Sequence, residues 1–135
     1  MFEKYTDQAR EVIMHARKEA TLSGSPTIGA EHILLGLMQA DIHLFTRLHG
    51  GFTLIRDELR KRVAERAAEG GNARISEEIT FNAESRQVLI CAFEEAAFMS
   101  SPNVDTRHLL LGLLRIENSP AHDLLAARGI DPEAV

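Results

Sequence analysis

The chain repeats itself at a constant offset of 76 residues without a gap, and this repeat limits the possible folds more than any other feature. Residues 25–38 return as residues 101–114, and residues 5–20 return as residues 81–96. The second stretch holds five identities, which are Arg10/Arg86, Val12/Val88, Ala16/Ala92, Glu19/Glu95 and Ala20/Ala96. An offset that is constant across two predicted helices and a loop indicates one helical unit used twice. With only two copies, a packed pair with pseudo-twofold symmetry is favoured over an open array.

The apolar and capping residues predict an all-helical fold. In the first half, Thr6 is expected to cap a helix over residues 7–22, and a buried central helix is expected to start near Ala30. Further helices are expected over residues 42–49, after a cap at Thr53, over 83–99 after a cap at Asn82, over 106–117, from Ser119-Pro120 to Gly129, and from Asp131-Pro132 onward.

These elements predict a single domain over residues 1–135. Repeat one should cover about 1–70, a linker about 70–80 with residues 75–80 extended, and repeat two about 81–135. The last helix of repeat two would be truncated by comparison with repeat one. We therefore interpret the chain as a fragment of a longer protein, with a naturally short chain as the alternative.

A glycine stands inside the central helix of each half. Gly36 returns as Gly112, although glycine within a helix costs about 1 kcal/mol relative to alanine. The recurrence predicts that another helix passes too close to both positions for a side chain.

Composition and charge argue against several classes of function. The formal net charge of -5 and the lack of a long Lys/Arg run argue against a nucleic-acid partner. No apolar run is long enough to cross a membrane, and the N-terminus lacks the apolar stretch of a signal peptide. A single cysteine excludes an internal disulfide and is consistent with a reducing compartment, so a cytoplasmic location is expected.

Motifs that carry catalysis or bind metals are missing from the sequence. It contains no glycine-rich phosphate loop, no His-Glu-x-x-His and no Cys-x-x-Cys, so no cofactor, no metal and no catalytic residue are expected. Cys91 lies on an apolar helical stretch, which favours a buried inert thiol over a nucleophile. The sequence therefore favours a binding module over an enzyme.

Polar residues recur in the first turn of the central helix. His32 and His108 occupy one position of the repeat, and we expect structural histidines that satisfy loop carbonyls or an adjacent carboxylate. Glu31 precedes the first of them. It is either a carboxylate favoured by the helix dipole or an acid that faces a ligand at the mouth of a groove.

The repeated block resembles the signature of the Clp N-terminal repeat domain, Gly-Thr-Glu-His-Ile-Leu-Leu-Gly-Leu, which here reads GAEHILLGL at residues 29–37. The opening MFEKYTDQAR is also similar to that of the Clp C-type unfoldases. The resemblance covers essentially the whole chain. It implies two tandem four-helix repeats, eight helices in all, at the front of a AAA+ unfoldase ring that feeds a peptidase.

The resemblance also implies a site for phosphorylated arginine. In C-type members the acid of the Gly-x-Glu-His motif takes the guanidinium, a position matched here by Glu31. Thr6 is the hydroxyl that we match to the phosphate, with a plain helix cap as its alternative role. The equivalent of Glu31 in the second half is Arg107, which reverses the charge, so at most the first site is expected to work in this way.

A second implied surface surrounds the N-terminal aromatic residue and the start of the fifth helix, where cyclic peptide antibiotics bind in some members of the family. Phe2, Phe81 and Arg86 occupy the matching positions. Phe81 is alternatively a core residue that staples the fifth helix.

Three functional interpretations follow. The first is a non-catalytic module that receives substrates and adaptor proteins for a Clp ATPase, whose AAA+ module is in the same chain or in trans. The second is a freestanding protein of the same fold that docks on a Clp complex and modulates it. The third, an enzyme with an unrecognised helical site, is disfavoured by the apolar central helices and the missing motifs.

Overall fold

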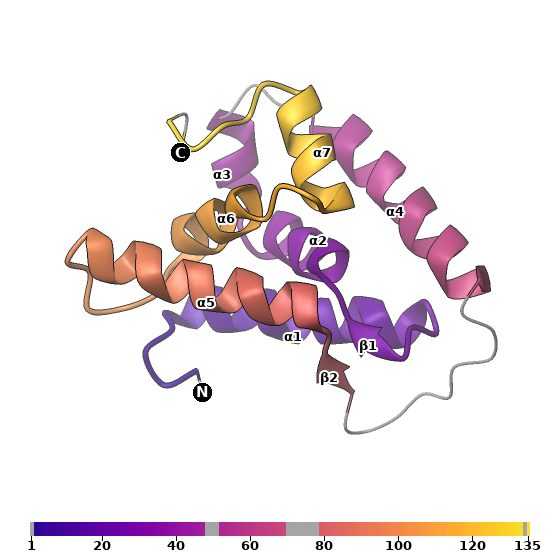
Figure 1. Ribbon diagram of the computed structural model, residues 1–135, viewed down its shortest axis with the longest axis horizontal. Coiled ribbons are helices and arrows are strands. Elements are labelled where there is room, and N and C mark those ends of the chain that lie inside the picture. The colour runs from indigo at the N-terminus through magenta and orange to yellow at the C-terminus, as the bar shows by residue number, and fades with distance from the viewer. Residues whose placement is uncertain (1, 48–51, 70–78, 134) are drawn as a thin grey trace.

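The computed structural model describes residues 2–47, 52–69, 79–133 and 135, which form helices and two short strands (Figure 1). The elements in chain order are α1 (Asp7–Leu22), β1 (Thr27–Ile28), α2 (Ala30–Ala40), α3 (Ile42–Arg47), α4 (Phe52–Glu69), β2 (Thr80–Phe81), α5 (Ala83–Phe98), α6 (Thr106–Arg115) and α7 (Pro120–Ala127). The predicted all-helical class is confirmed, with the two strands as an addition. Within the described residues no helix is both long and apolar enough to cross a bilayer.

Most of the predicted caps are present. The side chain of Thr6 accepts a hydrogen bond from the backbone of Ala9 at 3.1 Å, and that of Asn82 accepts one from Ser85 at 2.8 Å. Ser119 caps α7, whose first residue is Pro120, as expected. Thr53 is different, because α4 already begins at Phe52 and the predicted cap at Thr53 is therefore wrong.

The described part of the second half has three helices where the first half has four. At the position of the eighth helix, Pro132 and Glu133 form a turn, so the expectation that Asp131-Pro132 opens a helix is not met. The predicted link between the halves falls mostly on residues 70–78, which lie outside the described residues.

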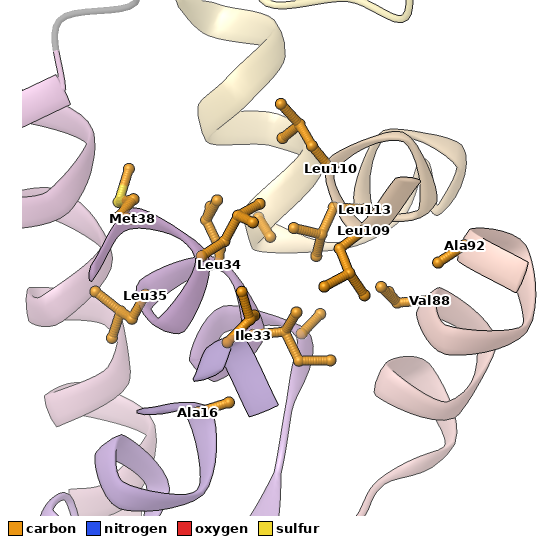
Figure 2. Packing of buried hydrophobic residues seen from close by; sticks show 14 of the residues in the cluster. Ala16, Ile33, Leu34, Leu35, Met38, Val88, Ala92, Leu109, Leu110 and Leu113 are labelled. Atoms are coloured by element: carbon orange, nitrogen blue, oxygen red, sulfur yellow. The ribbon is translucent and has the colours of Figure 1, made fainter. Parts of the chain in front are cut away.

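The two central helices form the core. Every residue of α2 from Ala30 to Met38 is buried, and α6 is buried from His108 to Leu114. α1 packs along α2, α5 packs along α6, and α2 and α6 contact one another between them. Figure 2 shows Val88 and Ala92 of α5 facing Leu109 of α6 in this core.

The glycines inside α2 and α6 mark equivalent close approaches of two backbones. A Cβ on Gly36 would collide with the carbonyl oxygen of Val12 and would lie 2.9 Å from the backbone nitrogen of Ala16. A Cβ on Gly112 would lie 2.5 Å from the oxygen of Val88. Val88 is 76 residues after Val12, so the predicted close crossings are confirmed and obey the repeat.

The halves are joined by two equivalent strand pairings. Ile28 of β1 pairs in parallel with Phe81 of β2, and an isolated parallel bridge joins Tyr5 to Val104. Both residues of the second pairing are related to those of the first by the offset of 76 residues. Each half therefore places the segment before its first helix against the loop that precedes the central helix of the other half.

The recurring histidines close the N-terminus of each central helix. Nδ1 of His32 accepts a hydrogen bond from the backbone of Gly29 at 2.8 Å, and Nδ1 of His108 accepts one from Asp105 at 2.9 Å. Both rings are buried. The structural role is confirmed: each Nδ1 is bonded to a backbone N–H of the preceding loop, and that of His108 also lies 3.4 Å from the carboxylate of Asp105, one of the two kinds of partner expected.

Gly36→Ala and Gly112→Ala should each destabilise the protein. The added methyl group meets backbone atoms, which are held by the α1 or α5 helix, and the resulting overpacking should outweigh the better helix propensity of alanine. We expect a loss of about 1–3 kcal/mol in the free energy of unfolding, measured by urea denaturation. Unchanged or increased stability in either variant would contradict the close crossing.

Candidate functional site

An open groove runs along the exposed face of α5. It has a volume of about 530 Å³ and is lined by Tyr5, Arg86, Leu89, Ile90, Phe93 and Glu94. Ile90 and Phe93 are 50% and 54% exposed, although both are large apolar side chains. Exposed apolar side chains beside a groove are typical of protein-interaction sites, because binding removes them from water.

The equivalent face of α1 has a different character. The repeat matches Ile90 to Met14, Phe93 to Arg17 and Glu94 to Lys18. The apolar groove is therefore a property of the second half, and the pseudo-twofold symmetry of the backbone does not extend to this surface.

The structure brings the three residues of the predicted partner surface together at one end of this groove. The ring of Phe2 lies 4.9 Å from that of Tyr5 and 6.1 Å from that of Phe81, both edge to face. Arg86 donates a hydrogen bond to the backbone oxygen of Phe81 at 3.1 Å. Phe2 and Phe81 are both half-buried, so they contribute to the fold as well as to the surface.

Tyr5 links this aromatic group to the groove. Its side chain is 7% exposed, and burial raises the pKa of its phenol to about 12. It therefore stays a neutral hydroxyl-bearing wall of the groove throughout the physiological pH range.

Ile90 and Phe93 were missed by the sequence-based prediction of the surface. Their signal is present in the chain: all five residues from Leu89 to Phe93 are apolar, so this stretch is apolar on every side of the helix. A helix that packs along one neighbour cannot bury all of these side chains, so some of them must face water.

Glu31 is buried against the second half of the domain. Its side chain is 2% exposed and folds back over Gly29, where a Cβ would lie 2.5 Å from Oε2 of Glu31 and 3.2 Å from Nδ2 of Asn82. Asn82 is the residue that caps α5. The missing side chain at residue 29 leaves room for the carboxylate beside that helix N-terminus.

Thr6 lies at the equivalent place in the other strand pairing. Its backbone N–H donates to the oxygen of Val104 at 3.0 Å, while its hydroxyl caps α1. The crossed pairing thus places Asn82 beside Glu31, and it places Thr6 near the loop that leads to Arg107. Arg107 is exposed and pairs with Asp105 at 3.5 Å.

Cys91 has no feature of a reactive thiol. It is free and 7% exposed, and burial raises the pKa of its thiol, with a smaller opposing effect from Arg115. A raised thiol pKa lowers the fraction of thiolate, which is the nucleophilic form. Across the described ranges there is no group of three or more His, Cys, Asp or Glu that could hold a metal ion.

Comparison with known proteins identifies relatives over the whole chain. Chloroplastic chaperone protein ClpC2 of Oryza sativa subsp. japonica is 33% identical over 135 residues, which are 100% of this chain and 15% of that protein. A probable ATP-dependent Clp protease ATP-binding subunit of Chlamydia pneumoniae is 32% identical over 135 residues, 100% of this chain and 16% of that protein. The chain therefore spans only a small part of the length of these relatives.

Two solved structures have the same fold. The N-terminal domain of Hsp104 from Candida albicans matches with a TM-score of 0.78 at 18% identity, over 98% of this chain and 86% of that one. The N-terminal domain of ClpD from Arabidopsis thaliana matches with a TM-score of 0.72 at 23% identity, over 98% and 90%. The model of one protein family, the Clp repeat (R) N-terminal domain, matches residues 4–128. With the repeated helices, the fold and this match in agreement, the chain belongs to the Clp repeat N-terminal domain family.

Proposed function

We propose that this domain receives protein substrates and adaptor proteins for a Clp-type AAA+ unfoldase that works with a peptidase, and that it catalyses no reaction itself. The observation that carries the proposal is the apolar groove on α5, with Ile90 and Phe93 exposed beside the Phe2–Phe81 aromatic contact. Unfolded or adaptor segments offer apolar side chains that such a groove can cover. Nucleic acid and membranes are not expected as partners, and a cytoplasmic location stays a prediction.

The domain serves this role either as the front part of an ATPase chain or as a freestanding protein that modulates a Clp complex. Both versions use the same surface, because both require capture of a protein segment without chemistry. They differ in a measurable way: in the second, the chain on its own binds an assembled Clp ATPase and changes its rate of proteolysis.

The groove residues should carry the binding of unfolded protein. Ile90→Ser and Phe93→Ser should each weaken binding of a fluorescently labelled, permanently unfolded protein such as carboxymethylated lactalbumin about tenfold, because each removes a large apolar contact. Fluorescence anisotropy measures the affinity. Met14→Ser is the matched control, since Met14 is the equivalent of Ile90 on α1 and is 59% exposed. An equal loss in the control would indicate non-specific hydrophobic binding.

Phe2 and Phe81 should affect stability and binding to different degrees. Phe2→Ala removes two aromatic contacts near the chain end and should cost about 0.5–1.5 kcal/mol. Phe81→Ala should cost more, because the Phe81 side chain packs against the core directly before the Asn82 cap of α5. Thermal unfolding and anisotropy with the same unfolded probe test both effects. If Phe2→Ala lowers the melting temperature as much as Phe81→Ala does, Phe2 belongs to the core and not to the binding surface.

We further propose that the domain recognises phosphorylated arginine at Glu31, where the first half meets the start of α5. The Glu31 carboxylate supplies a partner for a guanidinium, and the N-terminus of α5, which is capped by Asn82 next to Glu31, supplies backbone N–H groups for a phosphate. Asn82 thereby takes the part first assigned to Thr6. This second function uses a site separate from the groove, so either proposal can fail alone.

Free phosphoarginine should bind at one site per chain in a calorimetric titration. Glu31→Ala should abolish the heat of binding because the guanidinium loses its carboxylate, and Glu31→Gln should do the same with little change of shape. Arg107→Ala should have no effect, because the equivalent site in the second half has the wrong charge. Two equal sites, or binding that survives Glu31→Ala, would contradict the proposal, and unphosphorylated arginine serves as the ligand control.

A further inference from the structure

Charges are arranged in a self-complementary way on the exposed face of α5. Arg86, Ile90 and Glu94 follow one another at intervals of four residues, so they lie in one row along the helix. The row has a cation at one end, an exposed apolar side chain at its centre and an anion at the other end. All three residues are exposed.

We propose that α5 pairs in antiparallel orientation with α5 of a second copy of this chain, about a twofold axis at Ile90. Reversing the helix direction about Ile90 places Arg86 of each copy opposite Glu94 of the other, because both residues are four positions from the centre. One twofold axis therefore produces two identical ion pairs that flank an apolar contact. The same three residues on both copies therefore supply all the opposite charges that the contact needs.

Phe93 completes the contact. In the antiparallel arrangement the residues after the axis in one copy lie beside the residues before it in the other, so Phe93 of one copy lies at the Arg86 end of the groove in the other. This end of the groove is lined by Tyr5 and Leu89. The half-exposed ring of Phe93 thereby leaves water on pairing, which favours association.

At the Glu94 end of the row, two carboxylates lie against one cation, so this end keeps a negative charge for the partner's cation. Glu94 already contacts Arg115 of its own chain at 3.0 Å, but the two side chains are 56% and 41% exposed, and an exposed carboxylate accepts more than one cation. Glu95 faces the same Arg115 at 3.7 Å. The guanidinium of Arg86 donates one bond to the backbone of Phe81, which leaves its other donors for a partner.

The first half of the chain offers a natural comparison. The repeat matches the row on α5 to Arg10, Met14 and Lys18 on α1, which has cations at both ends. Antiparallel pairing of α1 with itself would oppose like charges, so of these two equivalent helices it is α5 that has the self-complementary row. A single helix pair makes a small interface, and the expected association is weak and reversible.

Pairing would cover the groove that is proposed to receive unfolded protein. The inference itself does not rest on that function, because association of the pure chain needs no client. If both hold, self-association and the binding of unfolded protein compete for the groove. At high protein concentration and without unfolded protein, the dimer then covers the groove.

Sedimentation equilibrium of the whole chain tests the inference at loading concentrations from about 10 µM to about 1 mM. We expect a monomer–dimer equilibrium. Arg86→Glu and Glu94→Arg should each weaken it about tenfold, because each creates two like-charge contacts across the twofold axis. The double variant Arg86→Glu with Glu94→Arg should restore it, and Phe93→Ser should weaken it with no change in charge.

Lys18→Glu on α1 is the matched control for charge, because Lys18 is exposed and is the equivalent of Glu94, and it should leave the equilibrium unchanged. Circular dichroism and melting temperature establish that each variant is folded, which is expected because the substituted side chains are exposed. A monomer at every concentration would overturn the inference. A dimerisation constant that is unchanged by the single charge reversals, or one that the double variant fails to restore, would overturn it as well. Client binding by a chain that stays monomeric would leave the proposed function intact.

Discussion

The crossed strand pairing between the halves is the interaction on which the rest of the structure depends. Ile28 of the first half pairs in parallel with Phe81 of the second half, and Tyr5 of the first half pairs in parallel with Val104 of the second half. These backbone hydrogen bonds satisfy groups that would otherwise be buried without partners where the halves meet. They also set both candidate sites, because Phe81 leads to the aromatic end of the groove and the next residue, Asn82, lies beside Glu31.

The two halves share a backbone plan but not a surface. Close crossings at Gly36 and Gly112, and histidine acceptors at the start of α2 and α6, recur because the packing of two central helices imposes them in each copy. The outward faces are free of that requirement. As a result, α5 presents an apolar groove with a balanced row of charge, where α1 presents cations.

Much of the fold was predictable from the sequence. Helix α1 and the start of α2 lie where the caps and apolar spacing indicated, and α5 begins after Asn82 as expected. Less of the candidate sites was predictable. Phe2, Phe81 and Arg86 were expected together and lie together, but Ile90 and Phe93 were missed, because exposure of an apolar helical residue depends on which neighbours cover it. Thr6 was grouped with Glu31 on the family resemblance alone, whereas the residue that lies beside Glu31, Asn82, is placed there by the pairing of the two halves.

The sequence by itself determined the repeat, its helices and their caps, because these depend on residues within a few positions of one another along the chain. It also determined that a backbone passes close to Gly36 and Gly112, since a helical glycine that recurs at a fixed offset has no other evident reason. Only the tertiary structure decided which half supplies the neighbour of each residue. The crossed strand pairing joins residues far apart in the chain, such as Ile28 and Phe81, which are 53 positions apart. No local sequence pattern predicts that these residues pair between the halves and not within one half.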